Sequence, residues 1–256
     1  MKKYVGSLIA IMLFNLIGLA QGPPIILDKI ILLGSNSFTA RTLTEYRNTE
    51  RGDFVYTPFS LSYLPTSNTT FTVDVPFINY DFESGSSGSS LADIRLTGKY
   101  QFYQKNATGK TFRILIKTEQ TLPTGESLDL IGLSTGLYQG YYGILGGYES
   151  LKFGITSELG YNWIPDGTLD HLRYKLGFGL PLLKPQFPNK QINLYFEYSS
   201  FWIFERDWYQ LLYAQGIQYA GKDYTIELSA QIPIVNDVDA DRELNYSLFI
   251  GGRYTF

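Results

Sequence analysis

The last thirteen residues of the chain alternate between two kinds of side chain. Every second position from Leu244 to Phe256 is apolar or glycine, whereas the positions between them are mostly small or polar and include Asn245 and Arg253. Alternate side chains of a β-strand point to opposite faces, so the pattern predicts a strand with one apolar face and one polar face. The strand ends at the carboxyl terminus on an aromatic residue.

The same alternation recurs upstream, and charged residues fall in only one of the two sets. In 112–119, for example, Arg113, Lys117 and Glu119 all lie opposite Phe112 and Ile116. An Arg or Lys that faces lipid at the bilayer midplane costs about 2–4 kcal/mol, and a one-residue slip would turn every such charge outward. A soluble β-sandwich also alternates, but with shorter strands and fewer aromatics than the 21 Tyr and 17 Phe found here. The pattern therefore favours an all-β, antiparallel transmembrane β-barrel whose apolar sets face lipid.

The amino terminus predicts export. Lys2 and Lys3 precede an apolar run that ends at Gly18-Leu19-Ala20, which is typical of a secretory signal peptide cleaved after Ala20. We expect a signal peptide at 1–20, a leader at 21–37 and a barrel at 38–256, located in the cell outer membrane. Removing the two lysines from 21 basic residues leaves 19 against 24 acidic ones, a balance that disfavours nucleic acid as a partner.

Twelve strands account for the alternation, and single-chain bacterial barrels have an even number. They are predicted at 38–48, 53–64, 69–80, 91–104, 110–121, 129–142, 148–163, 168–182, 190–204, 208–220, 223–235 and 243–256. Both termini are then expected to be periplasmic. The connections between these strands are short, so no long lid is expected over the lumen.

The polar sets predict which side chains line the lumen. The lumen-lining prediction comprises Arg95, Lys99, Arg113, Lys117, Glu119, Lys152, Glu158, Arg173, Lys175, Tyr195, Glu197, Glu227 and Arg253. Charges in a narrow lumen must be paired or hydrated, so we expect ion-pair ladders with some excess of positive charge. Such ladders either brace a filled barrel or leave a water path for anionic or polar solutes.

The number of strands does not decide between a filled and an open lumen. Barrels of eight strands are filled and those of sixteen are open, and twelve is intermediate. Inward glycines such as Gly160 and Gly177 open space, whereas Tyr103, Tyr195 and Phe249 are predicted to point inward and close it. The leader at 21–37 is too apolar for a solvated tail. It is either a loosely ordered leader or a plug that enters the lumen.

Catalysis and metal binding find little support. His171 is the one histidine, and the position two residues later, where outer-membrane phospholipases carry their serine, is Arg173. A nucleophilic serine needs such a histidine as its base. The acidic run at 236–241 lacks the spacing and the distal Glu of a Ca²⁺ loop. Cysteine is absent, which excludes disulfides and thiolate-bound metal. We expect no enzyme and no cofactor.

Several motifs resemble one family of outer-membrane barrels. They lie at 59–63, 73–77, 91–100, 122–126 and 160–162, of which Leu122-Pro123-Thr124-Gly125-Glu126 is the most specific. The chain resembles the outer-membrane proteins assigned to the MetA pathway of phenol degradation over most of 50–182, although Glu126 stands where Asp is commoner. The resemblance implies a barrel linked to uptake of small aromatic or hydrophobic compounds. The turn also has a purely structural interpretation, because Pro123 ends a ladder and Gly125 permits a positive φ.

The sequence thus predicts an outer-membrane channel or transporter for a small-molecule solute, which is hydrophobic or aromatic if the resemblance holds. The alternatives are a closed structural barrel with a side-chain-filled lumen and an outer-membrane hydrolase. The expected partners are outer-membrane lipid and the barrel-assembly machinery, which reads terminal aromatics such as Tyr254 and Phe256 as an assembly signal. The identity of the solute and the oligomeric state do not follow from the sequence.

Overall fold

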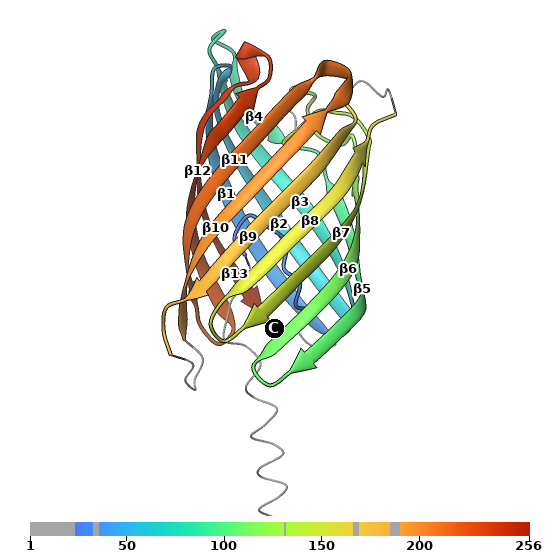
Figure 1. Cartoon of the computed structure of the whole chain (residues 1–256). Helices are drawn as coiled ribbons and strands as arrows, with labels where there is room; N and C mark the ends of the chain where they lie inside the picture. The colour runs from blue at the N-terminus through green and yellow to red at the C-terminus, as the bar shows by residue number, and fades with distance from the viewer. Residues whose placement is uncertain (1–23, 33–35, 131, 166–168, 185–189) are drawn as a thin grey trace, which may run out of the picture.

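The computed structural model describes residues 24–32, 36–130, 132–165, 169–184 and 190–256 (Figure 1). The predicted signal peptide at 1–20 lies outside these residues. The described chain forms thirteen strands and two 3₁₀ turns: β1 Ser37–Thr49, β2 Gly52–Thr66, β3 Thr69–Phe82, β4 Ser87–Leu91, β5 Arg95–Ala107, β6 Lys110–Thr121, β7 Gln139–Ser150, β8 Gly154–Trp163, β9 His171–Pro181, β10 Gln191–Ile203, η1 Phe204–Arg206, β11 Trp208–Ala220, β12 Tyr224–Asp237, η2 Ala240–Arg242 and β13 Leu244–Thr255. Within the described chain, no helix is long and apolar enough to span a membrane.

The strands close into one antiparallel barrel. β1 pairs with both β13 and β2, and β2 also pairs with β3, so the sheet has no free edge at this seam. β4 and β5 pair with successive stretches of β3, at 77–81 and 69–74 respectively, and therefore occupy one position in the wall. The wall has twelve strands, as predicted.

The exterior of the barrel is apolar along each strand. In β12, Ile226, Leu228, Ile232 and Ile234 are all about half exposed, whereas Glu227 between them is fully buried. Alternation with period two places the first set on the outer surface and the second in the lumen. A sheet with this pattern is stable only where lipid covers its outer face, so the strands have the register of a transmembrane barrel.

The two ends of the barrel differ in their connections. At the lower end in Figure 1, which we call the turn end, lie the β2–β3, β5–β6, β7–β8, β9–β10 and β11–β12 connections and both termini of the barrel. The other end, the loop end, carries the remaining connections. The predicted periplasmic position of the termini corresponds to the turn end and remains a prediction.

The strand predicted at 129–142 is wrong, and so is the turn predicted at 143–147. β7 instead runs Gln139–Ser150, with glycines in its middle. A Cβ at Gly143 would lie 2.4 Å from the Oη of Tyr141, and one at Gly160 of β8 would lie 2.3 Å from the same atom. The glycines therefore make room for a tyrosine ring in the lumen, which is why a glycine-rich stretch here is strand and not turn.

Residues 122–130 and 132–138 belong to a loop that folds against the inner wall, which we call the inward loop. Its Leu128, Leu130 and Leu133 are buried in one cluster with Phe54 and Ile78 of β2 and β3. Leu130 and Leu133 lie within the stretch predicted as a strand, but they belong to this loop. The expectation of uniformly short connections is therefore wrong at this position.

Asp93 holds the inward loop in place. It lies in the break between β4 and β5, is 1% exposed, and accepts hydrogen bonds from the backbone N–H groups of Gly125, Thr135 and Gly136 at 3.1, 2.9 and 2.9 Å. A Cβ at Gly125 would lie 2.3 Å from the backbone of Ala92. The Leu-Pro-Thr-Gly turn thus needs glycine for a close approach to the wall.

Two bulges reverse side chains that were assigned by simple alternation. A bulge between Gln101 and Tyr103 turns Tyr103 outward, where it is 45% exposed and packs against Phe112. A second bulge, at the Asn48/Thr49 step of β1, leaves Leu244 buried and Asn245 exposed. The predicted inward position of Tyr103 and the predicted lipid-facing position of Leu244 are both wrong, because an extra residue changes the period locally.

Candidate functional site in the lumen

Residues 24–32, which we call the lumen segment, lie inside the barrel (Figure 1). Ile25, Leu27, Ile30 and Leu32 are all buried, and Ile30 and Leu32 pack in one apolar cluster with Leu64 of β2, Leu115 of β6 and Leu145 of β7. The leader was expected to be either loosely ordered or a plug. The contacts place this part of it within the lumen.

The inner wall is shaped to receive the lumen segment. A Cβ at Gly147 would lie 2.5 Å from Ile30, and one at Gly216 would lie 2.5 Å from Ile25. Any larger residue at either position would collide with the segment. The two glycines therefore leave the space that Ile25 and Ile30 of the segment occupy.

Polar groups of the wall also hold the backbone of the lumen segment. The Glu197 carboxylate accepts hydrogen bonds from the N–H groups of Ile26, at 3.1 Å, and Leu27, at 3.0 Å. The Arg41 guanidinium donates to the carbonyl oxygen of Ile25. Because buried backbone groups without partners are costly, these contacts help to fix the segment in the lumen.

Asp28 connects the lumen segment to two lysines. Its carboxylate accepts hydrogen bonds from Lys99 of β5 and from Lys117 of β6, the latter at 2.6 Å. Burial alone would raise the pKa of the Asp28 carboxyl, but the positive charges of Lys117 and Lys99 outweigh burial and hold that pKa well below its usual range. Asp28 is therefore a charged contact at neutral pH.

Lys29, the next residue, has no comparable partner. Its Nζ is buried and makes no hydrogen bond within the described part of the chain. Burial, together with the nearby positive charges of Arg253, Lys99 and Arg41, lowers the pKa of Lys29 from 10.5 to about 7. The lumen segment thus carries two adjacent ionisable residues: Asp28, which is paired with lysines, and Lys29, which has no hydrogen-bond partner among the described residues.

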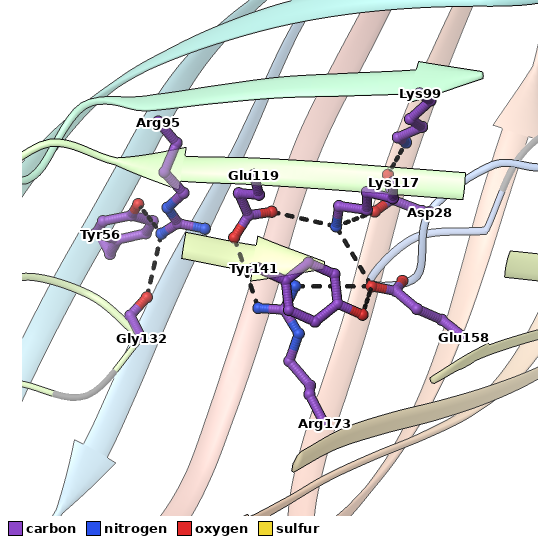
Figure 2. Close-up of polar contacts among 10 residues, drawn as sticks. All are labelled: Asp28, Tyr56, Arg95, Lys99, Lys117, Glu119, Gly132, Tyr141, Glu158 and Arg173. Atoms are coloured by element: carbon purple, nitrogen blue, oxygen red, sulfur yellow. Dashed lines mark hydrogen bonds and ion pairs between the residues drawn. The ribbon is translucent and has the colours of Figure 1, made fainter. Parts of the chain in front are cut away.

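Beside Asp28, a network that we call the crossbar lies on the lumen side of four neighbouring strands, from β6 to β9 (Figure 2). It consists of Lys117, Glu119, Tyr141, Glu158 and Arg173. The ammonium of Lys117 lies 3.1 Å from a carboxylate oxygen of Glu119 and 3.4 Å from one of Glu158. Arg173 lies 3.6 Å from each of the same two carboxylates, and its guanidinium lies 3.7 Å from the centre of the Tyr141 ring.

A second polar network lies across β1, β12 and β13. Glu227 accepts a hydrogen bond from Arg41 at 2.8 Å and lies 3.4 Å from Arg253. Gln218 also donates to Glu227, at 3.0 Å. Glu227 is completely buried, so these partners are what permit a charge at that position.

Two cavities remain between these groups. One, of about 230 Å³, which we call the mid cavity, lies against the lumen segment and is lined largely by polar residues such as Thr39, Ser60 and Asp74. The second, of about 270 Å³, which we call the vestibule, is bounded by Asp129, Leu130 and Gly132 of the inward loop. Arg95, Arg173 and Lys175 line both cavities, so these side chains lie at the boundary between them.

The structure places most of the predicted lumen residues in these networks and cavities. Arg95 donates to Tyr56 and to the carbonyl oxygen of Gly132, which ties the wall to the inward loop. Tyr195 is 2% exposed. Arg113 lies apart from the networks and bonds to Gln101 at 2.9 Å.

Lys152 was predicted in the lumen but lies in the exposed turn between β7 and β8. The Ser150 hydroxyl accepts a hydrogen bond from the N–H of Phe153 at 3.1 Å, which fixes this turn and ends β7 before Lys152. The prediction followed from the misplaced strand boundary.

Several residues of the site were not predicted. Arg41 lies on the polar face of the first strand, so alternation could have identified it. Tyr141 was hidden by the misplaced sixth strand. Trp208 begins a predicted strand and shares its inner face with Gln210, so alternation could have identified it too. Asp28 gave no signal, because it lies outside the strand pattern.

His171 shows no catalytic arrangement. Its Nδ1 lies 2.8 Å from the carbonyl oxygen of Leu169, and its ring packs edge-on against Phe201. Within the described chain, no hydrogen bond joins it to a serine or to a carboxylate. The described residues likewise contain no group of three His, Cys, Asp or Glu side chains placed to hold a metal ion.

The closed twelve-stranded wall, the apolar exterior and the charged lumen define an outer-membrane β-barrel. No protein-family model matches the chain, and no curated protein sequence matches it. The resemblance to the MetA-pathway family therefore stays a prediction.

Solved structures with the same fold include channels. The COG4313 outer membrane channel from Pseudomonas putida F1 superposes with a TM-score of 0.65 at 12% identity, covering 92% of this chain and 100% of that one. The KdgM porin gives 0.54 at 10% identity, covering 85% and 99%. The β domain of the Bordetella autotransporter BrkA gives 0.51 at 12% identity, covering 87% and 100%. At such identities the likeness establishes the fold.

Proposed function

We propose that the protein is an outer-membrane channel for small molecules, with its termini on the periplasmic side. The observation that carries the proposal is the pair of cavities stacked along the lumen, which share Arg95, Arg173 and Lys175. A barrel that served only as a scaffold would gain stability by packing this space with side chains. Similarity in shape to a channel and a porin supports the same function.

The lumen segment acts as the gate of this channel. It lies against the mid cavity and is attached through Asp28 to Lys99 and Lys117. Ionic attachment suits a gate, because ion pairs and backbone hydrogen bonds can re-form after displacement. Movement of the segment would widen the path through the lumen.

The lining favours polar or anionic solutes with a flat apolar body. Cationic side chains line both cavities, whereas Phe54, Phe201 and Trp208 supply aromatic surface in the vestibule. A neutral, wholly apolar solute would have to displace water from these charges without replacing its hydrogen bonds. The hydrophobic solute implied by the family resemblance is therefore less well matched than an aromatic anion.

Single-channel recording in planar bilayers tests the proposal. We expect the chain without its signal peptide to conduct intermittently and with anion preference, measured as the reversal potential in a salt gradient. A variant without residues 24–32 should conduct for a larger fraction of the time, whereas Lys152→Gln in the exposed turn should match the parent. Absence of conductance from both the parent and the deletion variant contradicts the proposal.

The second candidate function is a closed structural barrel. The crossbar favours it, because five side chains from neighbouring strands fill part of the lumen with their charges matched against one another. Under this hypothesis the deletion variant would remain non-conducting and would be less stable, since the segment would serve only as core. Conductance of the deletion variant at a level above that of the parent excludes it.

A further inference from the structure

The vestibule holds an excess of positive charge. Its lining includes six cationic side chains and one carboxylate, that of Asp129: the cations are Arg47, Arg51, Arg95, Arg173, Lys175 and Arg242. Positive charge concentrated in a water-poor cavity is unfavourable unless counter-charges compensate it. The question is therefore which of these cations the protein itself neutralises.

Three of the cations have nearby acidic partners. Arg47 pairs with Glu45 at 2.8 Å. Arg242 and Arg51 share the single carboxylate of Asp129, with Arg51 at 3.8 Å. Asp129 is 54% exposed, so it is the rim of the vestibule that is partly neutralised.

The floor of the vestibule is different. Lys175 makes no ion pair with any described residue, and Arg173 reaches its two carboxylates only at 3.6 Å. The Nε and Nη2 atoms of Arg173 are buried without a hydrogen bond among the described residues. Buried guanidinium donors normally have acceptors, so Arg173 has two unused hydrogen-bond donors here, and Lys175 beside it has no ion-pair partner among the described residues.

Aromatic rings stand beside this unmatched charge. Phe201 of β10 packs edge-on to His171 with ring centres 5.9 Å apart. Trp208 of β11 is 7% exposed and lies next to the guanidiniums of Arg206 and Arg242, at 5.1 and 5.4 Å. A ring inserted here would exchange water for apolar and π surface.

We propose that the vestibule is a binding site for a small carboxylate with a flat apolar body. The carboxylate accepts hydrogen bonds from Lys175 and Arg173 at the floor, and the body packs against Phe201 and Trp208. The cavity of about 270 Å³ sets the size of the ligand. The inference deepens the proposed channel function, because the bound carboxylate is then the solute at the loop end.

Binding is measured separately from conduction, on the full chain in detergent micelles. Benzoate is the probe, and calorimetry together with quenching of tryptophan fluorescence is the readout. Trp163 and Trp202 are exposed on the outer surface, so quenching that survives a Trp202→Phe substitution and is lost with Trp208→Phe reports the vestibule. Benzyl alcohol keeps the ring without the charge, and acetate keeps the charge without the ring.

We expect benzoate to bind at least tenfold more tightly than benzyl alcohol or acetate. Lys175→Gln should weaken benzoate binding roughly tenfold, as expected for loss of one charged hydrogen bond, and Phe201→Leu should weaken it by a smaller factor. Lys152→Gln, which removes an exposed cation, should leave binding unchanged. Retention of the folded barrel in each variant is checked by the heat-dependent shift in its electrophoretic mobility.

Equal binding of benzoate and benzyl alcohol, or equal effects of Lys175→Gln and Lys152→Gln, overturns the proposed site. Either result leaves the channel proposal standing if the bilayer measurements show conductance. Conversely, tight benzoate binding by a barrel that never conducts supports the site while refuting the channel.

Discussion

The Asp28 carboxylate accepts a hydrogen bond from the Lys117 ammonium at 2.6 Å, and Lys117 also belongs to the crossbar. One lysine therefore connects the lumen segment to the charge network on the inner face of β6 to β9 (Figure 2). Displacing the segment removes a negative charge from Lys99 and Lys117 together. Opening of the gate is thus coupled energetically to the state of the crossbar.

Asp28→Asn should weaken this attachment. A hydrogen bond between charged groups is worth about 1.5–3 kcal/mol, which corresponds to roughly tenfold or more in an equilibrium constant. We expect the open fraction in single-channel recordings to rise by at least that factor. Asp223→Asn is the matched control, because Asp223 is half exposed and pairs with Lys222 at the turn end. Equal open fractions for the two variants would refute the role of Asp28.

Gly160→Ala should destabilise the barrel by crowding Tyr141. The added Cβ would lie 2.3 Å from the tyrosine hydroxyl oxygen, and overpacking of this kind costs about 1–3 kcal/mol. Gly146→Ala is the control, because a Cβ there meets nothing within 4 Å. The readout is the midpoint of urea unfolding in micelles or vesicles. An equal loss of stability in both variants would contradict the role of contact with Tyr141.

The twelve-stranded wall could be predicted because one physical rule governs every strand. Lipid excludes charge, so Glu227 and Lys117 had to face inward and Ile226 and Ile116 outward, whatever the neighbouring strands were. Errors occurred where a bulge changed the period, as at Tyr103 and Leu244. The alternation within one strand does not reveal a bulge, because a bulge is defined by how the strand pairs with its neighbour.

The contents of the lumen could be predicted only in part. Alternation placed Arg173 and Glu158 on the inner face, but their proximity depends on the stagger of β8 and β9, which the sequence does not reveal. Leu128 and Leu133 have the composition of a strand and lie instead in the inward loop, because the inner wall offers Phe54 and Ile78 as an apolar surface. Asp28 was missed because its partners lie on strands distant in the sequence.

Asp93→Ala should release the inward loop. The substitution removes the acceptor of three buried backbone hydrogen bonds, and each buried donor left without a partner costs about 1–3 kcal/mol. We expect limited proteolysis within 122–138 to become at least tenfold faster while the barrel itself stays intact. Glu83→Gln alters an exposed carboxylate at the same end and should leave the cleavage rate unchanged. Resistance of Asp93→Ala to the protease would show that the leucines alone hold the loop.

The lowered pKa of Lys29 leads us to predict that gating depends on pH. In the docked segment the pKa of Lys29 is about 7, whereas in a solvated, displaced segment it returns to its ordinary value near 10.5. The displaced state therefore binds the proton more tightly, and lowering the pH from about 10 to 7 favours displacement. Below pH 7 both states are protonated, so no further change arises from this group. The charges that face it are those of Arg41, Lys99, Arg253 and the adjacent Asp28.

We therefore expect the open fraction to rise as the pH falls from 10 to 7 and then to level off until about pH 4. Below that, protonation of Asp28, whose docked pKa is lowered, begins to favour the displaced state again. Lys29→Met should abolish the upper transition and leave the lower one, because methionine fills similar space without a charge. Lys152→Met in the exposed turn should keep both transitions. Persistence of the upper transition in Lys29→Met would assign it to another group in the lumen.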